Sequence, residues 1–193
     1  MHAKQKRLIV GITGATGSIY GIRLLEILRE KEGIELHLVI TEYAEKTIRY
    51  ETDYSIQDVK TLADYTYNID DLSARIASGS FPVDGMVIVP CTVKTMSAIA
   101  SCFNVNLLIR AADVVLKERR PLIIGLRESP LHLGHIRLMY ELAQRGVIIM
   151  PLTPVFYTRP RSIKDIVDQT VARILSLLNI NCGILKSWEG EER

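Results

Sequence analysis

The 193-residue chain has few cysteines, little excess charge and no long apolar segment. Its three cysteines, Cys91, Cys102 and Cys182, form no CxxC pair, which argues against a disulfide framework and indicates a reducing cytoplasm. The 24 Lys and Arg residues nearly balance 22 Asp and Glu residues, and a net charge of +2 is too small to indicate nucleic-acid binding. No apolar run approaches the roughly 18 residues of a membrane span, and the basic N-terminus lacks the apolar region of a signal peptide.

The sequence does contain a regular alternation of short apolar runs and helical patterns. Strands are expected at 7–13, 35–40, 85–90, 122–126 and 147–150, and residues 64–80 form a polar connection. Helices are expected at 18–30, 42–51, 55–62, 93–101, 107–118, 131–145 and 162–178. Strands separated by helices predict a single-domain, doubly wound α/β fold, Rossmann-like or flavodoxin-like, with a parallel sheet covered on both faces. The domain spans 1–193, with its core at about 7–178 and a C-terminal tail at about 179–193.

The turn after the first expected strand is the glycine-rich segment GITGATGS, residues 11–18. Glycines allow a tight turn, and a helix that starts there offers N–H groups to a phosphate. The spacing differs from the GxGxxG dinucleotide pattern, and the second strand ends at Thr41, not at an acid suited to a ribose. A mononucleotide therefore fits at least as well as NAD, and a turn that binds nothing is the alternative.

Other candidate segments follow the later strands, whose carboxyl ends share one edge of such a sheet. PCTVKT (residues 90–95) predicts an anion or flavin-edge site, while Cys91 fits a buried structural cysteine better than a nucleophile. In RESPLHLGH (127–135), Ser129 suits a helix N-cap, and His132 and His135 fit packing or capping better than a metal site. FYTRP (156–160) places aromatic rings beside arginine.

Seven motifs in a fixed order resemble the flavin prenyltransferase (UbiX) family over about residues 7–178. They are GITGATGSIYG, YETDYS, ASGSF, VIVPCTVKTMSAIA, RAADVVLKERRPL, RESPLHLGHIRLM and PVFYTRP. The resemblance implies that reduced FMN is alkylated at N5 and then at C6 by dimethylallyl phosphate, without a metal. It also implies that the prenylated FMN passes to a UbiD-type decarboxylase and that the enzyme is a homo-oligomer, commonly a dodecamer in this family.

The resemblance also implies roles for individual residues. FMN is expected to contact Gly14, Ala15, Thr16, Thr41, Thr92, Val93, Lys94, Thr95 and Arg127. The prenyl donor is expected to contact Tyr157, Arg173 and Arg110, and the catalytic candidates are Glu51, Lys117, Glu128 and Thr16. Cations around the leaving phosphate suit ionisation of an allylic phosphate, and a carboxylate can carry the proton from C6. Thr16, Thr41 and Thr92 stand where relatives often have serine, which keeps the hydroxyl and adds a methyl group.

Two rival functions remain at this stage. An FMN-dependent cysteine-type decarboxylase would share the fold, but its usual Pro-Ala-Ser-Ala-Asn-Thr stretch is here PCTVKT, without the asparagine. A non-catalytic flavin carrier or accessory subunit of a decarboxylase is the second rival. The sequence leaves open which decarboxylase is served and whether the donor is a monophosphate or a diphosphate.

Overall fold

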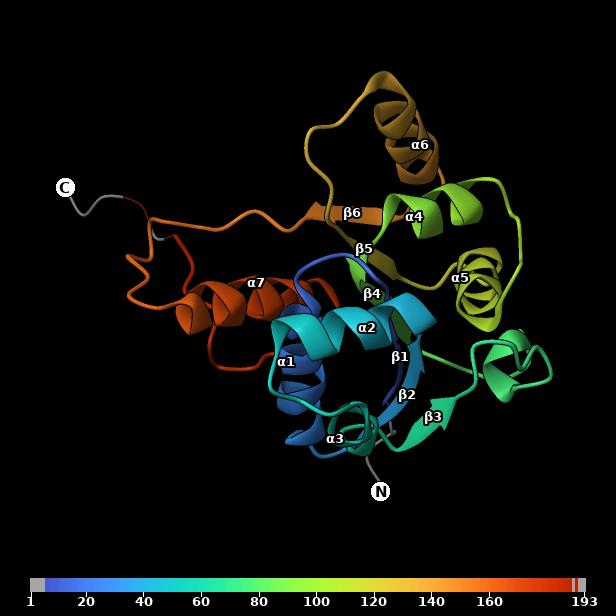
Figure 1. Ribbon diagram of the computed structural model, residues 1–193, viewed down its shortest axis with the longest axis horizontal. Helices are drawn as coiled ribbons and strands as arrows, with labels where there is room; N and C mark the ends of the chain where they lie inside the picture. Colours follow the sequence, from blue (N-terminus) through green and yellow to red (C-terminus); the bar gives the residue numbers. More distant parts are fainter. Residues whose placement is uncertain (1–5, 189, 191–193) are drawn as a thin grey trace.

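A six-stranded, wholly parallel sheet forms the centre of the computed structural model, which describes residues 6–188 and 190 (Figure 1). The strands are β1 (Lys6–Ile12), β2 (Ile34–Ile40), β3 (Tyr65–Tyr67), β4 (Gly85–Cys91), β5 (Leu122–Leu126) and β6 (Ile148–Pro151). Their order across the sheet is β3-β2-β1-β4-β5-β6, so the direction of winding reverses between β1 and β4. This arrangement confirms the predicted doubly wound α/β class.

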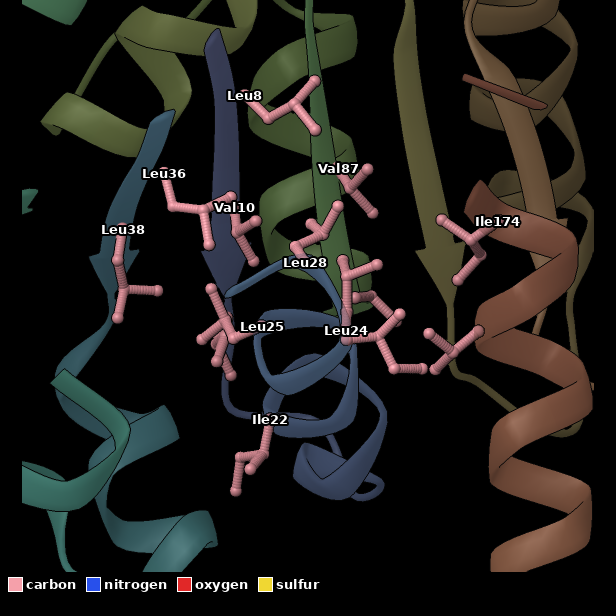
Figure 2. Close-up of a cluster of buried hydrophobic side chains, with 14 of the residues drawn as sticks. Leu8, Val10, Ile22, Leu24, Leu25, Leu28, Leu36, Leu38, Val87 and Ile174 are labelled. Atoms are coloured by element: carbon pink, nitrogen blue, oxygen red, sulfur yellow. The ribbon is translucent and has the colours of Figure 1, made fainter. Parts of the chain in front are cut away.

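Helices cover both faces of the sheet. They are α1 (Ser18–Arg29), α2 (Glu42–Glu51), α3 (Ile56–Thr61), the 3₁₀ helix η1 (Arg75–Ala77), α4 (Val93–Ala100), α5 (Leu107–Lys117), α6 (Leu133–Gln144) and α7 (Ile163–Leu177). One hydrophobic cluster joins the sheet to α1 and α7, and Figure 2 shows part of it, with leucines of α1 close to Val10 and Val87. A second cluster lies under α4 and α5.

Sequence features explain where several helices begin. Thr41, Thr92 and Asn106 have extended backbones, and their side chains accept hydrogen bonds from the backbone three residues ahead, which caps α2, α4 and α5. Ser55 and Ser162 form complete capping boxes for α3 and α7. All seven residues of β4 are buried, as expected for a central strand covered on both faces. These local signals fix the helix starts that lie at the carboxyl edge of the sheet.

Two elements differ from the sequence prediction. The segment 64–80 contains a sixth strand, β3, whose three residues Tyr65, Thr66 and Tyr67 lie at the sheet edge and carry no apolar run. Tertiary contacts hold it, because the buried His37 ring stacks on both tyrosine rings. Helix α6 begins two residues later than predicted, since the N-cap is His132, whose Nδ1 accepts from the N–H of Gly134 at 3.0 Å, and not Ser129.

The chain beyond α7 continues along the first cluster. Ile180 is 8% exposed and belongs to that cluster, and Cys182 and Ile184 pack against it. The side-chain amide of Gln169 both donates to the carbonyl of Lys186, at 2.8 Å, and accepts from its N–H, at 3.1 Å. In the described part of the chain, no helix is long and apolar enough to cross a membrane.

Candidate functional site

A cavity of about 780 Å³ opens at the carboxyl edge of the sheet, beside the reversal point between β1 and β4. In doubly wound sheets this crevice is the usual ligand site. Its walls are formed by Thr13, Gly14, Thr41, Glu42, Tyr43, Ile69, Asp70, Thr92, Lys94, Thr95, Ser97, Ala98, Ser101, Phe103, Val105, Asn106 and Ile109. Five of the residues predicted to bind FMN, namely Gly14, Thr41, Thr92, Lys94 and Thr95, are therefore gathered in one place.

The buried side chain of Thr13 joins the two strands that border the cavity. Its hydroxyl donates to the carbonyl of Pro90 at 2.8 Å and accepts from the N–H of Thr92 at 2.9 Å. The loop after β4 is thus held against the end of β1. Sequence reasoning overlooked Thr13 as a site residue, although its place at the end of an apolar run before glycine was visible.

The start of α4 supplies most of the groups suited to an anion. Thr92 caps the helix, and its hydroxyl bonds both the N–H and the hydroxyl of Thr95, at 3.1 Å each. The first N–H groups of a helix have no partner within the helix, so those of Val93 and Lys94 face the region before it. The exposed Lys94 adds an ammonium group at the same wall. A phosphate fits this corner by charge and by hydrogen-bond chemistry.

The N–H groups just after the glycine-rich loop already have a partner within the chain. The carboxylate of Glu51, at the end of α2, accepts from the N–H groups of Gly17 and Ser18 at 2.8 and 3.1 Å, and from the Ser18 hydroxyl at 3.1 Å. The start of α1 is thus occupied by a carboxylate. Partial burial raises the pKa of Glu51, but hydrogen bonds from Thr16, Gly17 and Ser18 outweigh burial and hold that pKa below its ordinary value.

Gly14 is required by a close approach of α2. A Cβ atom at this position would lie 2.5 Å from the Cβ of Tyr43 and 3.0 Å from its backbone carbonyl carbon. No side chain fits without moving the helix. The loop therefore contributes a smooth backbone wall at Gly14, where a flat ring or a sugar chain can approach closely.

The opposite side of the cavity is largely apolar. Ile69 follows β3, Phe103 and Val105 lie in the connection between α4 and α5, and Ile109 lies on α5. Phe103 is 65% exposed and Val105 is 49% exposed, so they form an apolar rim. A polar corner facing an apolar wall suits a ligand with a phosphate at one end and a large ring system at the other. Ile69 has no local signal in the sequence, because it lies in the polar connection 64–80.

The residues predicted for the prenyl donor and for acid–base catalysis lie outside this cavity wall in the described chain. Arg110 donates to the carbonyl of Ala77 at 3.2 Å and to the carboxylate of Asp113 at 3.0 Å, while Lys117 pairs with Glu118. The carboxylate of Glu128 accepts from the N–H of Ser129 at 3.0 Å.

The two remaining donor candidates, Tyr157 and Arg173, contact parts of the C-terminal region. The Tyr157 hydroxyl donates to the carbonyl of Lys186 at 3.3 Å, and its ring meets Trp188 edge to face. Arg173 is exposed on α7 and donates to the hydroxyl of Ser176 at 3.2 Å. Ala15, Thr16 and Val93 lie within two residues of cavity residues in sequence, and the N–H of Arg127 donates to the carbonyl of Cys91 at 3.1 Å, but none of these four residues is among those that line the cavity.

Cys91, His132 and His135 lie outside the cavity wall formed by the described residues. Burial raises the pKa of the Cys91 thiol, because its side chain is enclosed at the end of β4. The described side chains include no group of three or more histidines, cysteines or acids placed to hold a metal ion. The rings of His132 and His135 contact each other at the start of α6, tilted by 32°, and His132 caps the helix.

Comparison with known proteins gives a consistent result. Residues 1–175 match the family model described as Flavoprotein. The chain is 52% identical over 187 residues to flavin prenyltransferase UbiX of Escherichia coli K12, covering 96% of this chain and 99% of the relative. It is 51% identical over 186 residues to the UbiX flavin prenyltransferase of Thauera aromatica, covering 96% and 95%.

Solved structures agree. A crystal structure of AnUbiX (PadA1) in complex with FMN and dimethylallyl pyrophosphate has a TM-score of 0.95 and 46% identity, covering 98% of this chain and all of the other. A dodecameric FMN-dependent UbiX-like decarboxylase from Escherichia coli O157:H7 has a TM-score of 0.94 and 44% identity, covering 95% of this chain and all of the other. The FMN-dependent cysteine decarboxylase TvaF, at 16% identity and a TM-score of 0.61, shares the fold alone. The chain therefore belongs to the flavin prenyltransferase (UbiX) family of flavoproteins.

Proposed function

We propose that this protein joins the dimethylallyl group of dimethylallyl phosphate to N5 and C6 of reduced FMN, giving prenylated FMN for a UbiD-type decarboxylase. The observation that carries the proposal is near-full-length identity of about half to flavin prenyltransferases, in a chain whose cavity at the sheet reversal fits a flavin mononucleotide. The related structure in complex with FMN and dimethylallyl pyrophosphate supports both ligands.

The geometry favours one orientation of FMN. Its phosphate is expected at the start of α4, where Thr92, Lys94 and Thr95 offer hydroxyls and a positive charge. Its ring system is expected between the backbone at Gly14 and the apolar rim of Phe103 and Val105. Ala15, Thr16, Thr41, Val93 and Arg127 complete the proposed set of FMN contacts. Reduced FMN supplies the nucleophilic ring atoms, and the chain's own residues bind, orient and move protons.

Glu51, Glu128, Lys117 and Thr16 are the proposed catalytic residues. Glu51 is already oriented by hydrogen bonds from Gly17 and Ser18, and its lowered pKa keeps it ionised near neutral pH, as a proton acceptor must be. Glu128 follows β5 at the same edge of the sheet as the cavity. A carboxylate there is suited to accept the proton lost from C6, and the ammonium of Lys117 is suited to balance charge on the departing phosphate.

Tyr157, Arg173 and Arg110 are the proposed contacts of the donor phosphate. A guanidinium can hold a phosphate through two parallel hydrogen bonds, and both arginines expose part of their side chains.

The described cysteines are free, and we place the protein in the cytoplasm. We also propose that the whole chain is one domain and that it assembles as a homo-oligomer, by kinship with the dodecameric relative.

The test is anaerobic incubation of the purified protein with reduced FMN and dimethylallyl monophosphate, followed by mass spectrometry of the extracted flavin. A flavin heavier by one prenyl group supports the proposal. Bound but unmodified FMN, with both monophosphate and diphosphate donors supplied, would instead support the accessory-subunit alternative. Carbon dioxide released from a peptidyl-cysteine substrate would support the cysteine-type decarboxylase.

A further inference from the structure

Thr13 is a polar side chain in the interior of the molecule. It directly follows the buried end of β1 and is itself only 1% exposed. A buried hydroxyl costs free energy unless it is hydrogen-bonded, and that of Thr13 both donates to the carbonyl of Pro90 and accepts from the N–H of Thr92. These two bonds hold one segment of the chain, the residues that join β4 to α4.

The segment that Thr13 holds lies where the pairing of the sheet becomes irregular. The ladder between β1 and β4, which are neighbours at the centre of the sheet (Figure 1), ends at Ile88 of β4. On the other side of β4, the register with β5 shifts between Ile88 and Cys91. Pro90 has no N–H group to donate, and its carbonyl accepts from both the N–H and the hydroxyl of Thr13, at 3.2 and 2.8 Å. Thr13 therefore continues the connection between β1 and β4 beyond the regular ladder.

The hydrogen bond from Thr92 connects Thr13 to the start of α4. Thr92 has the extended backbone of an N-cap, and its hydroxyl accepts from the N–H of Thr95 at 3.1 Å. The same hydroxyl donates to the Thr95 hydroxyl at 3.1 Å, and the Thr95 hydroxyl has no acceptor among the described residues. Its hydrogen is therefore free for a ligand in the cavity, whose wall includes Thr95. Through Thr92, the bonds of Thr13 set where these groups point.

The start of α4 is open to a ligand, in contrast to the start of α1. At α1, the carboxylate of Glu51 accepts from the first N–H groups. At α4, the first turn contains no acid, and in the described part of the chain no side chain accepts from the N–H groups of Val93 and Lys94. An anion bound there depends on the directions of these groups, because a hydrogen bond weakens steeply as its angle departs from linear.

We propose that Thr13 is a positioning residue for the phosphate of FMN. Its hydroxyl holds the loop from Pro90 to Thr92 against the end of β1, and so fixes the start of α4 in the arrangement that binds the phosphate. The inference rests on the FMN site proposed above, and it adds a residue that acts through Thr92. The hydroxyl is buried and has both of its bonds within the chain, so it does not itself bind the ligand. Holding the binding groups in place beforehand lowers the cost of ordering them when FMN binds.

The test compares the affinities for FMN and for riboflavin, which lacks the phosphate but has the same ring system and ribityl chain. Thr13→Val keeps the shape of the side chain and removes the hydroxyl, which leaves the Thr92 N–H without its partner. The dissociation constant of this variant for FMN, measured by fluorescence titration, should rise at least about tenfold, the size expected when a buried group loses its hydrogen bond. Its dissociation constant for riboflavin should stay close to the wild-type value, because the cavity wall at Gly14 and Phe103 is unchanged.

Two further variants separate positioning from general stability. Thr13→Ser keeps the hydroxyl and should recover most of the FMN affinity that Thr13→Val loses. Thr170→Val is the matched control, since Thr170 is 2% exposed, donates to the carbonyl of Ile166 at 2.9 Å and is not among the described residues that line the cavity. It removes a buried hydroxyl of the same kind and should leave both affinities at the wild-type values. Circular dichroism shows whether each variant is folded, and Thr13→Ala replaces Thr13→Val if the latter is not.

Each contrary outcome is distinct. Equal losses of affinity for FMN and riboflavin in Thr13→Val would overturn the proposal, because general loosening of the cavity would explain both. Unchanged FMN affinity in Thr13→Val, or no recovery in Thr13→Ser, would overturn it as well. A wild-type protein that binds riboflavin as tightly as FMN would contradict the position of the phosphate, and the inference with it. Prenylation of FMN by the wild-type protein is measured separately, so the proposed function can stand where this inference fails.

Discussion

At the residue scale, Glu51 shows how one side chain can occupy N–H groups that a sequence motif predicts to bind a phosphate. The glycine-rich turn before α1 resembles a phosphate loop in sequence, yet its N–H groups at Gly17 and Ser18 are bonded to this carboxylate. A carboxylate and a phosphate satisfy the same positive end of a helix, which is why sequence alone could not distinguish them. On the cavity wall, the groups suited to an anion lie at the start of α4, with Thr92 and Lys94.

We expect Glu51→Gln to lower the stability of the protein at neutral pH by about 0.5 kcal/mol, because a partly exposed charge at a helix N-terminus contributes roughly 0.3–1 kcal/mol. The folded-state pKa of Glu51 is lowered, so its contribution is present above the unfolded pKa and is lost as pH falls through the folded value. The stability difference between variant and wild type should therefore shrink below about pH 4. Urea unfolding at pH 7 and pH 3.5 measures it, and a constant difference would contradict the explanation.

At the element scale, the main helices, the central strands and the edge strand β6 could be predicted, and the edge strand β3 could not. Thr41, Thr92 and Ser162 are cap residues readable in the sequence, and β4 is a continuous apolar run. Strand β3 has no such signal, because its stability comes from His37 on the neighbouring strand. The cavity residues also fall into a predictable and an unpredictable group. Residues directly after strands were predictable, whereas Phe103 and Ile69 reach the cavity only through the path of long connections.

The start of α4 allows binding to be separated from stability. Lys94 is exposed and lines the cavity, so Lys94→Met should weaken FMN binding by about tenfold to a hundredfold, because a hydrogen bond to a charged group contributes roughly 1.5–3 kcal/mol. The melting temperature of the variant without ligand should equal that of wild type. Fluorescence titration with FMN measures the loss, and Lys31→Met, in the turn between α1 and β2 and outside the cavity wall, is a matched control. If Lys94→Met and wild type bound FMN with equal affinity, the proposed position of the FMN phosphate at the start of α4 would be wrong.

The edge between β2 and β3 is expected to be sensitive to acid. Burial lowers the pKa of His37, although Glu35 beside it acts in the opposite direction, and its Nδ1 lies 2.8 Å from the Tyr67 hydroxyl. A histidine whose folded pKa is lowered stabilises the fold above the unfolded pKa, and this contribution is lost as pH falls below it.

Tyr67→Phe should therefore cost about 1–3 kcal/mol at pH 7, because it leaves a buried ring nitrogen without a partner. Thermal unfolding monitored at pH 7 and pH 5 tests both statements. Tyr50→Phe, at a hydroxyl on an exposed side chain, serves as the control. A wild-type protein as stable at pH 5 as at pH 7 would show that His37 does not titrate as described.

At the scale of the whole molecule, the groups proposed for the two substrates come from different regions of the chain. Five of the proposed FMN contacts follow β1, β2 and β4 and line one cavity, while Tyr157 and Arg173 belong to the C-terminal third and lie outside its wall. The order of motifs along the sequence identifies the family without showing this separation. Family membership and the geometry of a single chain are therefore independent arguments for assigning site residues. The assignment of Tyr157 and Arg173 to the prenyl donor depends on family membership.

Arg173→Lys and Tyr157→Phe should impair use of the prenyl donor and leave FMN binding unchanged. Lysine keeps the charge of Arg173 but cannot form two parallel hydrogen bonds to a phosphate, so the KM for dimethylallyl phosphate should rise by at least about tenfold. Removing the Tyr157 hydroxyl deletes one hydrogen bond and should raise that KM by only a few-fold, since a neutral hydrogen bond contributes roughly 0.5–1.5 kcal/mol. Both side chains are exposed, and Arg173 bonds only to Ser176 on its own helix among described residues, so neither change should unfold the protein. FMN titration and donor-dependent turnover, measured on both variants and on Arg161→Lys as a control, separate the two ligands. Weaker FMN binding together with an unchanged donor KM would place these residues on the wrong ligand.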